Sequence, residues 1–167
     1  EADQKQAALA NLRKNIKDYP RGLLQLQKRL SMELEQKMGK PVEVPILADV
    51  LEMKEEAWRG AVEGYLNTQK FYLLVEPACY PEAQKLYDLI KEEFGQSSFG
   101  IVDIGKLREK EKLQPLENSL AQKVETENDL ARSYIDYLLG RVVCCERVEE
   151  LRRHKTAITA EGMLYQG

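Results

Sequence analysis

The chain has 167 residues, of which 43% are apolar and 32% are charged, and its net charge is −3. No apolar run approaches the roughly 18–20 residues that a membrane-spanning helix needs, and the opening residues, Glu1 to Gln4, do not form a signal peptide. These features indicate one globular domain of ordinary size with a short appendage, and the missing initial Met indicates a piece of a longer chain. The three cysteines, Cys79, Cys144 and Cys145, are too few and odd in number for a disulfide framework and favour the cytoplasm.

The first 40 residues predict two helices. Apolar residues at positions 9, 12, 16 and 19 follow the a/d spacing of a coiled coil, and Pro20 ends that helix. A second helix is predicted over Leu23–Met38, with Gly39 as its C-cap. Two interpretations remain open: a helical hairpin packed on the domain, or the top of a coiled-coil arm that ends near residue 40.

Residues 41–105 predict the order strand, helix, strand, helix, strand. The expected strands are Ile46–Met53, Phe71–Val75 and Phe99–Ile104, and the expected helices are Lys54–Thr68 and Glu82–Phe94. Apolar residues on both faces of the first strand indicate that it is covered on at least one side. The pattern is typical of an α/β (mixed α+β) domain, in which helices pack on a sheet.

Residues 118–167 predict a shorter copy of the same unit. We expect a helical turn over Ser119–Val124, a helix over Asn128–Leu139 capped by Thr126 or Asn128, a strand over Val142–Cys145, a short helix over Val148–His154, and a hairpin of Thr156–Thr159 and Met163–Tyr165. The run AVEGYLNTQKFYLLVE can be laid over YIDYLLGRVVCCE. We therefore expect two related halves, about 41–105 and 118–167, joined by an exposed charged segment, rather than one catalytic pocket.

Charge is distributed unevenly along the chain. Residues 1–40 hold nine basic and five acidic residues, a net +4, whereas residues 41–167 have a net −7. An acidic domain is not expected to bind the phosphate backbone of a nucleic acid over its whole surface. Two basic groups remain candidates for a local DNA contact, and the alternative is a charged face in solvent: Lys106, Arg108, Lys110 and Lys112, and then Arg152, Arg153 and Lys155.

The chemical motifs of enzymes are missing from the sequence. GQSSFG at 95–100 precedes a strand rather than a helix, which disfavours a phosphate-binding loop. His154 is the only histidine, without a second ligand for zinc or an evident nucleophile partner. Cys144 and Cys145 point to opposite faces of a strand, so at least one is expected in the core. We predict no catalytic residue, cofactor site or metal site.

Several longer phrases resemble a known family. EEAWRGAVEGYLNTQKFYLLVEP, an amphipathic helix and FGIVDI resemble the first half of the hinge of SMC-type chromosome-organising ATPases, and ARSYIDYLLGRVVCCERVEELRRHKTAITAEGMLYQG resembles the second half. The phrases ILADVLEM, WRGAVEGYL, DYLLGRVV and HKTAITAEGMLYQ are especially similar to the SMC-like subunit of bacterial anti-plasmid condensins of the Wadjet or MksB type, kin of MukB. The resemblance covers about residues 41–167.

The resemblance implies a homodimerisation hinge preceded by a coiled-coil stub and without catalysis of its own. It also implies a parent ATPase that organises DNA at the nucleoid, or acts against plasmids, together with other condensin subunits. Family hinges have glycine-rich segments at the dimer contact, whereas glycines are scattered here.

A terminal strand with unpaired backbone groups readily accepts a partner. The predicted dimer interface follows from that rule: Val142, Val143, Cys144, Cys145, Ile158, Met163, Leu164 and Tyr165. Two alternatives remain, a ligand-binding or regulatory α/β domain and a helical adaptor that uses residues 1–40.

Overall fold

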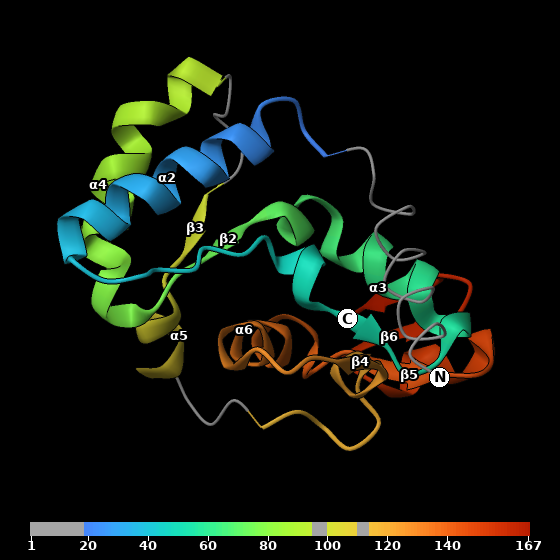
Figure 1. The fold of residues 1–167 in the computed structure, drawn as a ribbon. Coiled ribbons are helices and arrows are strands. Elements are labelled where there is room, and N and C mark those ends of the chain that lie inside the picture. Colours follow the sequence, from blue (N-terminus) through green and yellow to red (C-terminus); the bar gives the residue numbers. More distant parts are fainter. Residues whose placement is uncertain (1–18, 95–99, 110–113) are drawn as a thin grey trace, which may run out of the picture.

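The computed structural model describes residues 19–94, 100–109 and 114–167 (Figure 1). The helix predicted over Asp3–Tyr19 lies outside them except for Tyr19, which is not helical. The helices are α2 (Leu23–Met38), α3 (Arg59–Leu66), α4 (Tyr80–Ile90), α5 (Ile104–Glu109) and α6 (Asp129–Leu139). The strands are β1 (Glu52–Met53), β2 (Leu73–Leu74), β3 (Ile101–Val102), β4 (Val124–Glu125), β5 (Val143–Cys145), β6 (Thr156–Thr159) and β7 (Leu164–Gln166). Short 3₁₀ turns connect them: η1 (Leu47–Val50), η2 (Glu56–Trp58), η3 (Asn67–Phe71), η4 (Pro77–Cys79), η5 (Lys91–Phe94), η6 (Leu120–Lys123) and η7 (Val148–Arg153).

The strands form three small sheets. Strands β2 and β3 pair in parallel, and so do β5 and β6, while β7 adds to β6 in antiparallel fashion. Strands β1 and β4 pair with each other, with Met53 opposite Val124. The turn between β6 and β7 contains Gly162 at φ 94°, a conformation that glycine adopts without steric cost. The predicted α/β class and the predicted C-terminal hairpin are confirmed.

The two halves repeat the same backbone hydrogen bonds. In the first half, the Leu47 N–H donates to the Tyr72 carbonyl at 2.9 Å. In the second half, the Leu120 N–H donates to the Val142 carbonyl at 2.7 Å. The alignment of KFYLLVE with GRVVCCE therefore places structurally equivalent residues together.

A second pair of backbone hydrogen bonds is also equivalent in the two halves. The Leu74 N–H donates to Pro45 at 2.9 Å, and the Cys144 N–H donates to Asn118 at 2.8 Å. Isolated bridges also correspond, because Ile46 lies opposite Leu73 as Ser119 lies opposite Val143. In each half, the segment before the first turn pairs with the strand that follows the helix. The predicted relation between the halves is confirmed in the described residues.

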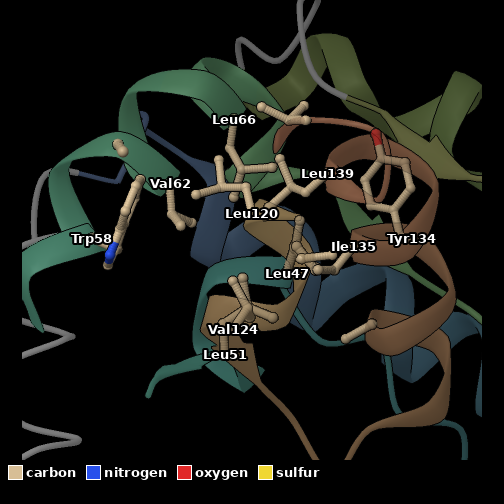
Figure 2. Packing of buried hydrophobic residues seen from close by; sticks show 14 of the residues in the cluster. Leu47, Leu51, Trp58, Val62, Leu66, Leu120, Val124, Tyr134, Ile135 and Leu139 are labelled. Carbon is tan, nitrogen blue, oxygen red and sulfur yellow. The ribbon is translucent and has the colours of Figure 1, made fainter. Parts of the chain in front are cut away.

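One hydrophobic core joins the halves (Figure 2). Helix α3 contributes Val62 and Leu66 to it, and helix α6 contributes Ile135 and Leu139. Residues of both helices lie in one cluster, so this core is complete only when the two halves are packed together. The β1–β4 pair lies beside this core and links the halves through the backbone.

A second core belongs to the first half and to α2. Helices α2 and α4 pack side by side (Figure 1), and the Lys37–Glu82 and Arg29–Glu93 ion pairs show that they run antiparallel. The buried leucines of α2 follow a helical stripe: Leu23, Leu26, Leu30 and Leu34. Helix α2 is therefore continuous with the packed domain, and the boundary at residue 40 stays a prediction.

The predicted strand Ile46–Met53 is wrong for most of its length. Residues Leu47–Val50 form the turn η1, and only Glu52 and Met53 are in a strand. Leu47 points into the shared core and Ala48 into the α2–α4 core. Apolar residues on both faces therefore reflect a turn between two cores rather than a strand covered on both sides.

Candidate functional site

The outer edge of β7 presents unpaired backbone groups. Register places Leu164 opposite Ile158 and Tyr165 opposite Ala157. The Thr159 N–H donates to the Met163 carbonyl at 3.0 Å. In an antiparallel pair, the backbone groups of successive residues point alternately towards and away from the partner strand. The N–H and C=O groups of Leu164 and Gln166 therefore point away from β6. Within the described residues, no strand pairs with that outer side.

Exposed apolar side chains accompany this edge. Met163 is 54% exposed and Leu164 is 43% exposed, while Tyr165 is half-buried against the small core beneath η7. Leu164 lies on the same face as Ile158, which is buried in the shared core. The apolar surface of the sheet thus continues from the core out to a free edge, the arrangement that a strand from another chain completes.

Strand β5 is not an edge, although the sequence suggested one. It pairs with β6 on one side, and residues 118–120 cover the other side through the Leu120 and Cys144 hydrogen bonds. Val142, Cys144, Cys145 and Ile158 are buried, and Val143 is half-buried. The expectation of a free edge at Val142–Cys145 is therefore wrong, because the segment before η6 occupies it. Participation of these five residues in an interface stays a prediction.

The two basic groups lie in different places. Lys106 and Arg108 are exposed on α5, and Arg152, Arg153 and Lys155 are exposed on and after η7. Figure 1 shows α5 and the β5–β6 pair, which η7 contacts, on opposite sides of the molecule. Lys110 and Lys112 lie outside the described residues. The structure therefore does not join the two groups into one basic surface.

Cys144 and Cys145 lack the surroundings of reactive thiols. Burial raises the pKa of Cys144 to about 11, against the smaller lowering by Lys123. Burial also raises the pKa of Cys145, and Glu150 adds to this effect. Because the thiolate is the reactive form, both side chains are inert neutral groups at pH 7.

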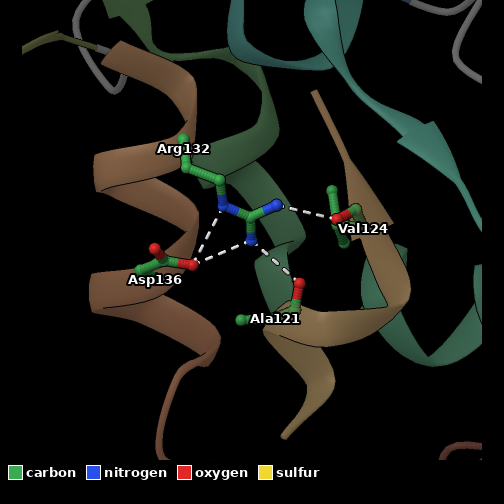
Figure 3. A network of polar contacts seen from close by, with 4 residues as sticks. All are labelled: Ala121, Val124, Arg132 and Asp136. Atoms are coloured by element: carbon green, nitrogen blue, oxygen red, sulfur yellow. Dashed lines mark hydrogen bonds and ion pairs between the residues drawn. The ribbon is translucent and has the colours of Figure 1, made fainter. Parts of the chain in front are cut away.

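Arg132 forms a polar clamp that the sequence analysis did not identify (Figure 3). Its guanidinium donates to the Val124 and Ala121 carbonyls at 2.8 Å and to Asp136 Oδ1 at 2.8 Å and 3.0 Å. The i,i+4 spacing of Arg132 and Asp136 was the available sequence signal. The clamp therefore holds η6 and β4 against α6 within the second half.

Comparison with protein families identifies the fold. The model described as "SMC proteins Flexible Hinge Domain" matches residues 41–153, which include the first half, the β1–β4 pair and the second half as far as the end of η7. This chain belongs to the SMC hinge-domain family. Hinge domains of this family are the dimerisation modules of SMC proteins and are not catalytic. The predicted hinge and the prediction of a non-enzymatic domain are confirmed at this level.

Solved structures share the hinge fold. The SMC hinge domain of Pyrococcus furiosus is 21% identical with a TM-score of 0.58, and the match covers 87% of this chain and 82% of that one. An asymmetric dimer of the Geobacillus stearothermophilus SMC hinge domain is 13% identical with a TM-score of 0.58, over 98% of this chain and 69% of that one. The Pyrococcus furiosus hinge with an extended coiled coil is 19% identical with a TM-score of 0.57.

The match to that longer structure covers 99% of this chain and 62% of its own length. At these identities, the likeness concerns the fold. Comparison of the hinge domain with curated proteins gave no match. Among the helices of the described residues, none has the length and hydropathy required to cross a bilayer.

Proposed function

We propose that this hinge domain joins two copies of its parent chain through the outer edge of β7. The observation that carries the proposal is the free edge itself, where Leu164 and Gln166 present unpaired backbone groups beside the exposed side chain of Met163. The related Geobacillus stearothermophilus hinge was solved as a dimer, which supports the same role here. A second copy would satisfy the backbone groups and cover the apolar side chains together.

Substitution at Leu164 tests this interface. In Leu164→Lys, a charge at the edge opposes strand pairing without loss of a core side chain. We expect the dimer dissociation constant, measured by sedimentation equilibrium, to rise at least about tenfold. This change corresponds to a loss of about 1.4 kcal/mol in binding free energy. Leu89→Lys is the matched control, since Leu89 is 75% exposed on α4, away from β7.

Three outcomes of this experiment are informative. A weakened dimer in Leu164→Lys with an unchanged Leu89→Lys supports the β7 interface. A wild-type chain that sediments as a monomer at micromolar concentration contradicts self-association. A dimer that withstands Leu164→Lys contradicts the β7 interface and favours another surface.

We further propose a weak DNA contact by the exposed basic residues of α5 and η7. The supporting observation is that Lys106, Arg108, Arg152, Arg153 and Lys155 all face solvent. Because the two groups lie apart, each should contribute separately to the salt dependence of binding. Fluorescence anisotropy with a duplex at several salt concentrations measures these slopes for alanine variants of each group, and unchanged slopes would exclude that group.

The parent chain is proposed to be an SMC-like ATPase of the Wadjet or MksB type, kin of MukB. It would act at the nucleoid in the cytoplasm with other condensin subunits in DNA organisation or plasmid defence. The phrases ILADVLEM and HKTAITAEGMLYQ support this assignment. A plasmid-retention assay in cells that express the full system, with wild-type or Leu164→Lys hinge, tests it. Equal plasmid loss with and without the system would contradict the defence role.

A further inference from the structure

Tyr19 fastens the start of the described chain to the first half. Its hydroxyl donates to Asp49 Oδ1, 30 residues away in η1. Its ring packs edge-on against Phe71 at the end of η3, with ring centroids 5.9 Å apart and an interplanar angle of 64°. Tyr19 therefore contacts the two turns that lead from the shared core to the α2–α4 core.

A tight corner follows directly. The Leu23 N–H donates to the Pro20 carbonyl at 3.1 Å, which closes a turn before α2. Gly22 has φ 85°, and a Cβ at this residue would lie 2.3 Å from the Phe94 carbonyl oxygen. Both the left-handed backbone and the lack of space require glycine. The direction in which the chain enters α2 is thus set by Tyr19 and Gly22.

A polar path continues from Asp49 into the second half. The residue after Asp49, Val50, accepts a hydrogen bond from Thr126 Oγ1 at 2.6 Å across 76 residues of sequence. The same hydroxyl oxygen accepts from the Asn128 N–H at 3.1 Å. The Asn128 side chain in turn caps α6 by accepting from the Ala131 N–H at 3.0 Å.

We propose that Tyr19 is a latch that couples the corner at Pro20–Gly22 to the N-terminus of α6. The direction of the entering chain and the seating of α6 on the β1–β4 pair then change together. The β1–β4 pair has two residues in each strand, and the Lys54 N–H extends it by donating to the Lys123 carbonyl at 3.0 Å. The Thr126–Val50 bond adds a side-chain link beside this pair. This inference does not depend on self-association.

Cross-measurement of hydrogen exchange tests the coupling in the full 167-residue chain. Tyr19→Phe removes only the hydroxyl, and Thr126→Val removes only the bonds of Oγ1. Coupling is reciprocal, so Tyr19→Phe should accelerate exchange at Ala131, and Thr126→Val should accelerate exchange at Leu23, each by about fivefold. The double variant should show less than the product of the single effects, because both break one path.

Controls separate coupling from general loosening. Tyr137→Phe, on the exposed side of α6, should leave both amides unchanged. Exchange at the buried Ile135 amide reports global unfolding, against which the other rates are normalised. Asp49→Asn serves as the second variant if Tyr19→Phe fails to fold. The latch would be overturned if Tyr19→Phe leaves exchange at Ala131 unchanged, or if Thr126→Val leaves exchange at Leu23 unchanged.

Discussion

The first and second halves share a backbone plan but differ in what is built onto it. In the first half, the strand β2 is followed by the 11-residue helix α4, which packs on α2. In the second half, the equivalent strand β5 is followed by the six-residue turn η7 and the β6–β7 hairpin. The repeated hydrogen bonds explain why both halves fold alike. The added elements explain why one half receives the helical segment and the other half presents a free edge.

The largest expected contrast concerns the two cores that the halves do not share, the α2–α4 core and the small core beneath η7. Leu30 of α2 is completely buried in the large α2–α4 core, whereas Leu151 of η7 lies in a small core with Cys145 and Ala157. A small core collapses around a missing side chain more easily. We expect Leu30→Ala to cost about 4 kcal/mol and Leu151→Ala about 2 kcal/mol, measured by urea denaturation followed by Trp58 fluorescence. Equal losses would show that the two cores are energetically alike.

The next contrast concerns Cys144 and its equivalent, Leu74, in the first half. The folded-state pKa of Cys144 is about 11, against an ordinary value of 9. Folding therefore favours the protonated thiol, and this stabilisation is full below pH 9 and is lost as pH rises towards 11. We expect wild-type stability to fall by roughly 2–3 kcal/mol more than that of Cys144→Ala over this range. Parallel stability curves for the two proteins would contradict the role of Cys144.

The Arg132 clamp is present only in the second half among the described residues. Arg132→Met keeps much of the aliphatic length and removes the bonds to Ala121 and Val124. Because hydrogen bonds to charged groups contribute about 1.5–3 kcal/mol, we expect a loss of about 2 kcal/mol in the free energy of unfolding. Asp136→Asn should cost less, since both carbonyl bonds remain. A loss in Asp136→Asn as large as in Arg132→Met would place the energy in the ion pair instead.

The smallest contrast concerns Ile46 and Ser119, which occupy equivalent bridges. Ser119 is completely buried, and its hydroxyl has no hydrogen-bond partner in the described structure. An unsatisfied buried hydroxyl costs about 1–3 kcal/mol, so Ser119→Ala should raise stability by about 1 kcal/mol. The reverse change, Ile46→Ser, should destabilise. A destabilised Ser119→Ala would indicate that the hydroxyl finds a partner, such as a water molecule.

The repeat was predicted well from the sequence because it depends on short-range sequence signals. The apolar spacing of α2 and α6, the Asn128 cap and Gly162 in the hairpin each act within a few residues of their position. The same signals could not separate the turn η1 from a strand, because Leu47 and Ala48 enter different cores only after the chain has packed.

The site was predicted less well because it depends on contacts between residues that are far apart in the sequence. Pairing of Asn118 with Cys144 joins residues 26 positions apart, and no local pattern shows that this segment covers β5. The free edge at β7 was predicted correctly as a strand, but its distinction from β5 depends on tertiary pairing. Arg132 was missed because the i,i+4 spacing with Asp136 shows only the ion pair, and its other partners are carbonyl groups, which any sequence supplies.

Amide exchange at Leu164 and Gln166, measured across protein concentrations, tests the β7 interface most directly. These amides face away from β6 and have no partner in the described chain. We predict that their exchange slows as concentration rises through the micromolar range, while the inward-facing Tyr165 amide stays protected throughout. Exchange at Leu164 and Gln166 that is fast and independent of concentration would contradict self-association through this edge.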